Sequence, residues 1–320
     1  MNVQEASVQL ASMTQALAQE VEKAIVGKRE VIHRAILTLL CNGHLLLEDI
    51  PGVGKTTLAK ALAKAVGGEF RRIQFTPDLL PTDVTGTSIF SQKDGQFSFI
   101  PGPIFGNVVL VDEINRATPK TQSALLEAME ERQVSIDGVT RPLPRPFFVI
   151  ATQNSIDMTG TYPLPEAQLD RFFARLSLGY PDAEAELAIL EAQQIVNPID
   201  HVQQVTSPES LEKAQLAIRE TRVDPRIREY IVEILRATRV HPLLQFGGSP
   251  RGSLHLMNAA QAHAAMEGRS FVTPDDVKNV APMVLGHRII LRPEIRARGG
   301  SQEDVVREVL TSVTVPLPVG

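Results

Sequence analysis

The chain has 320 residues, of which 43% are hydrophobic and 22% charged, and its formal net charge is −5. This composition is typical of a folded globular protein, and the length suits two or three domains of roughly 100–200 residues each. The acidic charge does not favour nucleic-acid binding, and because no apolar run reaches 18 residues, no membrane span is expected.

Targeting and cysteine signals point to the cytoplasm. The N-terminus lacks the basic and apolar stretches of a signal peptide. Cys41 is the single cysteine, so an internal disulfide cannot form, which fits a reducing compartment. With no partnered cysteines for a zinc site, we expect a soluble cytoplasmic protein.

The first part of the chain alternates between short β-type runs and helical stretches. The runs lie at residues 45–47, 70–75, 108–111, 147–151 and 174–178. Such alternation is typical of a parallel sheet with helices on both faces. We therefore predict an α/β domain with a five-stranded parallel sheet over residues 1–183.

The last part of the chain is dominated by helical periodicity. Helical patterns cover residues 211–221, 226–238, 250–266 and 274–285. These patterns predict a smaller all-α domain over residues 205–320, joined to the first domain by a linker at residues 184–204.

A glycine-rich loop between a strand and a helix is the strongest chemical signal. It follows the apolar run 45–47 and consists of Pro51, Gly52, Val53, Gly54, Lys55, Thr56 and Thr57. Glycines let backbone N–H groups curl around phosphate oxygens, and the helix N-terminus adds a partial positive charge. In such a P-loop, or Walker A motif, the lysine reaches the β- and γ-phosphates and the following hydroxyl binds Mg²⁺. Asp49 stands where the usual pattern has its first glycine.

An acidic pair follows the buried run 108–111. In P-loop proteins an acid at the end of a neighbouring strand, the Walker B position, holds Mg²⁺, so Asp112 is a candidate metal-binding residue with Thr56. Glu113 is then placed to polarise the attacking water. Taken without the P-loop, the same pair could be an ordinary helix cap.

Further motifs give the chain a more specific resemblance. It resembles the AAA+ ATPases, and more narrowly the MoxR family, in segments that cover nearly its whole length. The segments are IVGK (25–28), LLLEDIPGVGKTTLA (45–59), FTPDLLPTDVTG (75–86), FIPGPIF (99–105), LVDEINRA (110–117), ATQN (151–154), YPLPEAQLDRF (162–172) and GGSPRGSL (247–254). The resemblance implies a P-loop AAA+ core followed by a helical lid, which binds and hydrolyses ATP with Mg²⁺.

The resemblance also implies roles for residues beyond the P-loop. Val26 and Gly27 look like the segment that packs on the adenine. The alternative is that they form only a turn between two helices. Asn154 looks like the sensor that orients the hydrolytic water with Glu113. Arg171 looks like the arginine finger that reaches the γ-phosphate of a neighbouring subunit.

Other arginines complete or compete with this set. Arg175 and Arg116 are competitors for the finger role. Arg251 looks like the second sensor, which would couple the lid to the nucleotide, and its alternative role is to cap or solvate a helix.

Two β-hairpins are predicted as inserts, near residues 87–100 and 133–141. Asp-Gly pairs, at Asp94-Gly95 and Asp137-Gly138, favour tight turns between their strands. By resemblance these are the helix-2 insert and the pre-sensor-1 hairpin, which face the pore or the client in ring ATPases. Surface hairpins without a contact role are the alternative.

Three function classes follow, and the first is favoured. The resemblance implies a ring, of six subunits, that remodels or activates partner proteins, including metal insertion, with partners that carry a von Willebrand factor A domain. The alternative is an AAA+ motor or loader acting on nucleic acid, which the sparse basic residues of the hairpins do not favour. A small-molecule kinase would not need an arginine finger.

Overall fold

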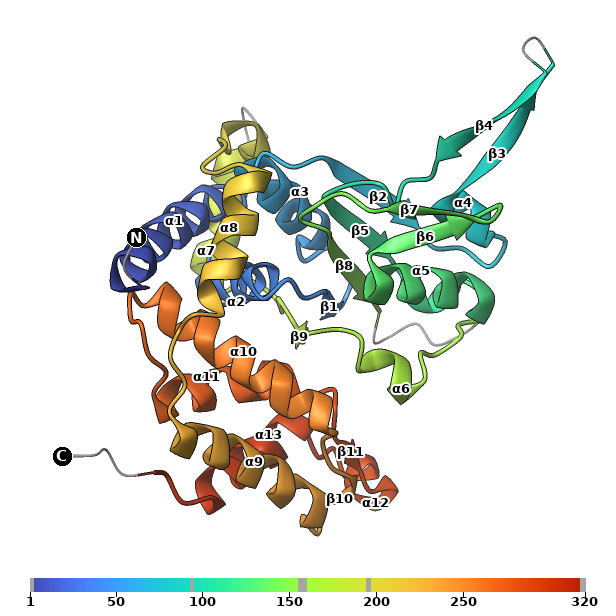
Figure 1. Cartoon of the computed structure of the whole chain (residues 1–320). Helices are drawn as coiled ribbons and strands as arrows, with labels where there is room; N and C mark the ends of the chain where they lie inside the picture. The colour runs from blue at the N-terminus through green and yellow to red at the C-terminus, as the bar shows by residue number, and fades with distance from the viewer. Residues whose placement is uncertain (1–2, 93–94, 155–159, 194–196, 317–320) are drawn as a thin grey trace.

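The computed structural model describes residues 3–92, 95–154, 160–193 and 197–316 (Figure 1). A five-stranded, wholly parallel sheet in the order β2-β5-β8-β1-β9 forms its centre. The strands are β1 (Leu45–Glu48), β2 (Phe70–Gln74), β5 (Val108–Asp112), β8 (Phe148–Gln153) and β9 (Ala174–Leu176). The parallel five-stranded core expected from the apolar runs is therefore confirmed.

The alternation of side chains along these strands builds two hydrophobic clusters, because successive residues of a strand point to opposite faces. One face packs on helices α1 (Val3–Glu22), α2 (Arg29–Leu40) and α3 (Lys55–Ala65). Its buried strand residues are Leu45, Leu47, Val108, Leu110, Phe148 and Ile150. The opposite face packs on helices α4 (Pro81–Thr85) and α5 (Pro119–Glu131). Its buried strand residues are Leu46, Ile73, Val109, Val111, Val149 and Ala151. Since both faces are covered, β5 is buried over its full length, as expected for a central parallel strand.

The helices of the core precede or follow the strands in sequence. They are α1 (Val3–Glu22), α2 (Arg29–Leu40), α3 (Lys55–Ala65), α4 (Pro81–Thr85), α5 (Pro119–Glu131) and α6 (Glu166–Leu169), with a 3-10 turn η1 (Ile114–Arg116). Among the described residues, no helix is both long and apolar enough to cross a membrane.

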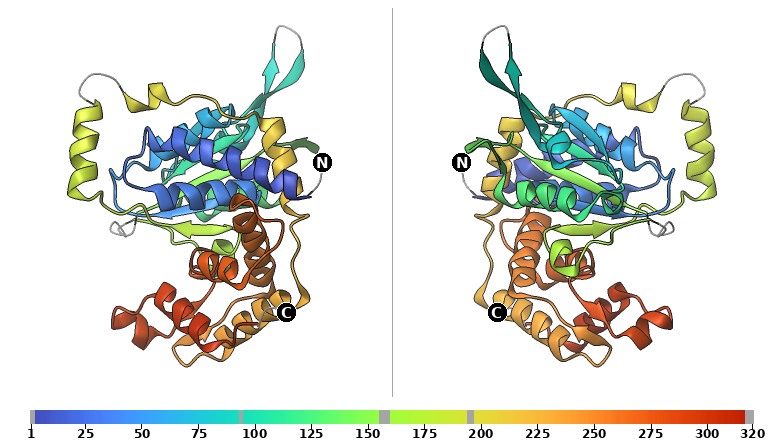
Figure 2. Two further views of the ribbon diagram at one scale, coloured as in Figure 1. Left: turned by 90° about the vertical axis from the view of Figure 1, so that its left-hand side faces the viewer. Right: turned by 90° about the vertical axis from the view of Figure 1, so that its right-hand side faces the viewer.

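Both predicted hairpins are present, and the first projects from the body of the protein (Figures 1 and 2). Its strands are β3 (Gly86–Ser91) and β4 (Gln96–Pro101), and those of the second are β6 (Gln133–Ile136) and β7 (Val139–Pro142). Positive φ angles of 53° at Asp137 and 74° at Gly138 form the predicted tight turn of the second hairpin. Lys93 and Asp94, at the first tip, lie outside the described residues.

The C-terminal region is the expected helical lid. Its helices are α9 (Pro225–Val240), α10 (Pro250–Met266), α11 (Pro274–Leu285), α12 (Pro293–Ala297) and α13 (Gln302–Ser312). A short antiparallel ladder joins β10 (Leu244–Phe246) to β11 (Ile290–Leu291), which the helical periodicity did not indicate. Strands of two or three residues carry too short a pattern to be recognised in a sequence.

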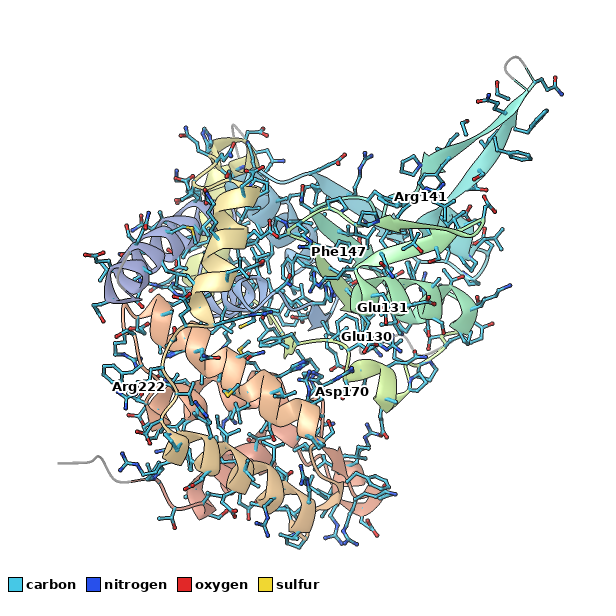
Figure 3. The ribbon with its side chains drawn as sticks, viewed as in Figure 1. Glu130, Glu131, Arg141, Phe147, Asp170 and Arg222 are labelled. Carbon is cyan, nitrogen blue, oxygen red and sulfur yellow. The ribbon has the colours of Figure 1, made fainter. Side chains whose placement is uncertain are left out.

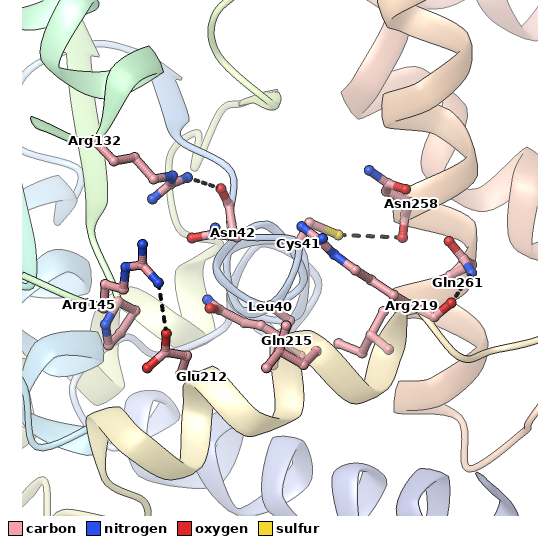
Figure 4. Close-up of a pocket in the computed structure, with 13 residues that line it drawn as sticks. Leu40, Cys41, Asn42, Arg132, Arg145, Glu212, Gln215, Arg219, Asn258 and Gln261 are labelled. Carbon is pink, nitrogen blue, oxygen red and sulfur yellow. Dashed lines mark hydrogen bonds and ion pairs between the residues drawn. The ribbon is translucent and has the colours of Figure 1, made fainter.

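The chain between sheet and lid forms α7 (Ala183–Gln193), a 3-10 turn η2 (Pro198–His201) and α8 (Pro208–Ile218). Helix α8 packs against α1 and α2 of the core as well as α10 of the lid. At this junction Gln215 donates to the carbonyl of Leu39 at 2.7 Å. Arg145 pairs with Glu212 at 3.5 Å, as the dashed line in Figure 4 marks. The domain boundaries at residues 183 and 205 stay predictions.

A buried arginine attaches the lid to the core. Arg288 is 8% exposed, and its Nε donates to Asp170 Oδ1 at 2.8 Å. The same guanidinium donates to the carbonyl oxygens of Phe172 and Phe173 at 2.6 and 3.0 Å. Burial lowers the pKa of Arg288 to about 10, an effect that Asp170 opposes. Arg288 therefore stays charged at neutral pH and holds the segment that follows α6.

A buried histidine links three parts of the core. The backbone N–H of Val149 donates to Nδ1 of His44 at 3.0 Å, and Nε2 of His44 contacts the carbonyl of Met129 at 3.1 Å. The ring is therefore neutral, with its proton on Nε2. Burial, together with the charge of Arg132, lowers the pKa of His44 to about 3.

This depressed pKa predicts a pH dependence of stability. The unfolded chain takes up a proton on His44 below its ordinary pKa of about 6.5, whereas the folded protein does so only near 3. The free energy of unfolding is therefore highest above pH 6.5. It declines as the pH falls from about 6.5 toward 3, by about 1.4 kcal/mol per pH unit. Urea unfolding of His44→Gln at pH 7, 6 and 5 should show a pH dependence shallower by about this amount. An equal pH dependence of the free energy of unfolding in wild type and variant would contradict the neutral, buried state of His44.

Candidate functional site

The P-loop connects β1 to the N-terminus of α3. Gly52 and Gly54 adopt φ angles of 86° and 96°, a left-handed conformation that glycine accepts without strain. Lys55 begins α3, and its Nζ donates to the backbone carbonyl of Asp49 at 2.8 Å. Burial lowers the pKa of Lys55, while the carboxylates of Asp49, Asp112 and Glu113 counter the shift. The loop and Lys55 thus line one small space.

Asp49 fastens the start of this loop to the chain that follows β9. Its Oδ2 accepts from Ser177 Oγ at 3.0 Å and from the backbone N–H groups of Leu178 and Gly179 at 2.6 and 2.8 Å. Its Oδ1 accepts from the N–H of Ile50 at 2.9 Å. A glycine at position 49 could make none of these bonds, so the departure from the usual motif has a structural role here.

Asp112 ends β5 beside the P-loop and is 8% exposed. Its Oδ2 accepts from Nε of Arg72 at 2.7 Å, and its Oδ1 accepts from Oγ1 of Thr152 at 3.2 Å. The same Thr152 oxygen accepts from the backbone N–H of Glu113 at 2.9 Å. Strand β8 therefore orients both acids of the pair through one hydroxyl.

Glu113 turns away from the strand in a left-handed conformation, with φ 56°. Its Oε2 accepts from Nε2 of Gln74 at 3.0 Å and lies 3.3 Å from Nε of Arg116. Gln74 is the last residue of β2 and is in register with Asp112 on β5. The parallel pairing of β2 with β5 thus brings a side-chain donor to the second carboxylate.

One cavity of about 400 Å³ collects most of the predicted nucleotide residues. It is lined by Pro51, Gly52, Gly54, Lys55, Thr56, Thr57, Arg72, Gln74, Asp112, Glu113, Thr152 and Asn154. They come from strands β2, β5 and β8, from the loops that follow the strands and from the first turn of α3, on the side where ligands of α/β sheets bind. The predicted P-loop, acidic pair and strand-end asparagine therefore meet in one place.

The predicted adenine segment lies beside the P-loop, between α1 and α2. Ile25 is so near that a Cβ added to Gly54 would lie 3.3 Å from its Cδ1. Gly27 has φ 74°, and a Cβ there would lie 2.9 Å from that of Ala185 on α7. Val26 and Gly27 do not line the 400 Å³ cavity; of this segment, it is Ile25 that lies against the P-loop.

The predicted arginines lie elsewhere. Arg171 pairs with Glu130 at 2.8 Å, and Arg251, one residue into α10, pairs with the same carboxylate at 2.5 Å. Both line a second cavity of about 190 Å³ that shares no residue with the first. Of the two other candidates for the arginine finger, Arg175 forms an ion pair with Glu48 at 3.3 Å, and Arg116 forms an ion pair with Glu113.

Comparison with known proteins agrees with this arrangement. Residues 44–174 match the ATPase family associated with various cellular activities (AAA), and residues 236–309 match the AAA lid domain. The chaperone MoxR1 of Mycobacterium tuberculosis is 44% identical over 306 residues, which cover 93% of this chain and 81% of that protein. This chain belongs to the MoxR family of AAA+ ATPases.

Two further relatives extend along the chain. YeaC of Bacillus subtilis is 52% identical over 299 residues and covers 93% of both chains. The crystal structure of a proposed ATPase from Cytophaga hutchinsonii superposes with a TM-score of 0.91 at 39% identity, over 98% of each chain. The MoxR-type core and lid are thus shared over nearly the full length.

Four contributors to this MoxR-type arrangement were not predicted from motifs: Arg72, Gln74, Thr152 and Glu130. The register of β2 beside β5 could have indicated Gln74, because a polar residue at that strand end must face Asp112. Thr152 lies within the quoted ATQN segment, one strand away from the acids it orients. Glu130 had no local signal, since it meets its partners only in the folded chain.

The bonds of Asp49 yield a counterintuitive prediction. Asp49→Gly restores the usual first glycine of a P-loop, yet it should destabilise the protein. The N–H groups of Leu178 and Gly179 would lose their acceptor, at roughly 1–3 kcal/mol for each buried donor left unpaired. Denaturant unfolding should show a loss of about 2 kcal/mol or more, and nucleotide affinity should fall with it. Asp49→Asn keeps one acceptor oxygen, so its stability should lie between those of wild type and Asp49→Gly. An Asp49→Gly variant as stable as wild type would refute the structural role of Asp49.

Proposed function

We propose that this protein hydrolyses ATP at the 400 Å³ cavity. The observation that carries the proposal is the convergence of Lys55, Thr56, Asp112, Glu113 and Asn154 on that one space. Lys55 and the P-loop N–H groups would hold the phosphates. Glu113 would accept a proton from the attacking water, which Asn154 would orient.

The residues present fit Mg²⁺ as the accompanying ion. The hydroxyl of Thr56 and the carboxylate of Asp112 line the same cavity, and oxygen ligands are those Mg²⁺ prefers. Among the described residues, no three histidine, cysteine or acidic side chains are arranged so that they could hold a metal ion by themselves. That agrees with an ion held by one carboxylate, a hydroxyl, water and phosphates. When bound, the ion would neutralise phosphate charge; Arg72 meanwhile holds Asp112 in place.

Two substitutions separate binding from turnover. Lys55→Ala removes the cation that meets the phosphates, so ATP affinity should fall by about tenfold or more. Glu113→Gln keeps the shape and removes the base, so ATP should still bind while turnover drops by about 10²–10⁴. Fluorescent-nucleotide titration and phosphate release measure the two quantities. Normal hydrolysis by Glu113→Gln would show that this carboxylate does not activate the water.

We further propose that the protein acts as a ring, of six subunits, in which Arg171 completes a neighbour's site. Arg171 and Arg251 line a different cavity from Lys55 and are paired there with Glu130, which supports a role for Arg171 at a neighbour's site. An arginine acting across an interface stabilises charge that develops in phosphoryl transfer. With Arg251 beside it, the lid would take part in the same contact.

Mixing two inactive variants tests this shared site. Arg171→Ala keeps an intact P-loop, and Lys55→Ala keeps an intact arginine side. Each homogeneous ring should lose activity, in the arginine case by roughly 10³–10⁵. Mixed rings should regain it, since some interfaces then join two intact halves. Absence of recovery at every ratio, in rings shown to be mixed, would refute the shared site.

For the biological role we propose a chaperone-like remodeller or activator of partner proteins. The name of the relative MoxR1 supports the chaperone role, and metal insertion into partners with a von Willebrand factor A domain is the finer form of the proposal. The β3–β4 hairpin offers a contact surface, with Phe90 and Phe97 exposed and their rings 5.2 Å apart. No observation favours the nucleic-acid alternative.

A further inference from the structure

Glu130 joins two arginines from different parts of the protein. It lies in the last turn of α5, and its side chain is 35% exposed. Oε2 lies 2.8 Å from Nη1 of Arg171, which follows α6 in the core. Oε1 lies 2.5 Å from Nη2 of Arg251, which belongs to the lid helix α10. Each carboxylate oxygen therefore holds one guanidinium.

The lid is held where this double contact can form. Arg288 donates a hydrogen bond to Asp170, the residue before Arg171. Oγ of Ser249, just before α10, lies 3.5 Å from Oδ2 of the same aspartate. Figure 3 labels Glu130 and Asp170 where the core meets the lid. The two arginines are thus brought to Glu130 by the attachment of the lid, rather than by neighbouring positions in the sequence.

The double contact leaves donors available. A guanidinium carries five N–H groups. Within the described part of the chain, Arg171 uses Nη1 for Glu130 and for the carbonyl of Leu126 at 2.9 Å, and Arg251 uses Nη2. The remaining N–H groups of both side chains can meet an anion while Glu130 stays bonded.

The charges leave the cluster attractive to an anion. One carboxylate compensates one of the two guanidinium charges, and Asp170 is already paired with Arg288. The two arginines and Glu130 together carry a net charge of about +1, and Arg132, which lines the same 190 Å³ cavity, adds a further positive charge. Such pre-oriented cations stabilise phosphate charge without paying the ordering cost at the moment of reaction.

We propose that Glu130 is a positioning residue for the shared ATPase site. It aligns Arg171 and Arg251 as a pair for the terminal phosphate of ATP bound by a neighbouring subunit. The proposal rests on the proposed function of Arg171 across the interface. Glu130 itself does not touch the nucleotide; it acts through the two arginines.

The substitution Glu130→Gln tests the role, with Glu131→Gln as the matched control. Glu131 is the next residue of α5, exposed, and without an ion pair in the described part of the chain. Glu130→Gln should lower kcat by about tenfold or more, since a neutral amide cannot hold two guanidinium groups. Its ATP affinity should stay unchanged, because the P-loop cavity lies on other elements. Glu131→Gln should match wild type in both quantities. A wild-type kcat in Glu130→Gln, or an equal loss in Glu131→Gln, would overturn the proposal.

Mixing distinguishes a positioning role from simple damage to the fold. Glu130→Gln subunits mixed with Lys55→Ala subunits should regain activity, because Lys55→Ala supplies an intact Glu130, Arg171 and Arg251. The mixture of Arg171→Ala with Lys55→Ala serves as the reference. If the reference recovers and the Glu130→Gln mixture does not, Glu130 has no role at the shared site, although that site stands. If neither recovers, the shared site is refuted and the proposal with it.

Discussion

The buried guanidinium of Arg288 ties the lid to the core segment that carries Arg171, while α10 of the lid also packs on α1 and α2 of the core. A charge taken out of water costs several kcal/mol unless hydrogen bonds and an opposite charge compensate it. Asp170 and the carbonyl groups of Phe172 and Phe173 supply that compensation, and all three belong to the segment around Arg171. The lid is therefore anchored on the same short stretch of chain that presents the arginine. A movement of the lid must displace this stretch or break a buried ion pair.

Two groups of side chains lie at separate cavities of the molecule. The P-loop, the acidic pair and Asn154 gather at the carboxyl edge of the sheet, whereas Arg171, Arg251 and Glu130 gather where α5 and α6 meet the lid. Under the proposed function each protomer carries both halves of a catalytic site but joins them only with a neighbour. Hydrolysis of the nucleotide would then depend on assembly, and the position of the lid would be coupled through Arg288 to the position of Arg171.

Local sequence predicted the parts of this structure that depend on local rules. Strands at residues 45–47 and 108–111 were predictable because buried parallel strands are continuously apolar, and Lys55 was predictable because a P-loop has few alternatives. β9 ends at Leu176, two residues before the predicted end, because the N–H groups of residues 178 and 179 turn to Asp49. Gln74 and Glu130 were not found, since their partners lie about 40 residues or more away in sequence. Arg251 pairs with Glu130 because the lid is attached beside α5, and no local motif encodes that attachment. The predicted contact of Arg251 with the nucleotide stays a prediction.

The bond between Asp49 and the chain after β9 also bears on the order of folding. Asp49 and Leu178 are 129 residues apart, and β1 pairs with β9 at the far edge of the sheet. Closing so long a loop costs entropy before any contact repays it, and non-local pairings of this kind slow folding. During synthesis the P-loop leaves the ribosome early, yet its buried aspartate has no donors from the β9 segment until residue 179 has followed. The nucleotide site is therefore completed late, and a chain interrupted before β9 holds its phosphate-binding loop without the support that shapes it.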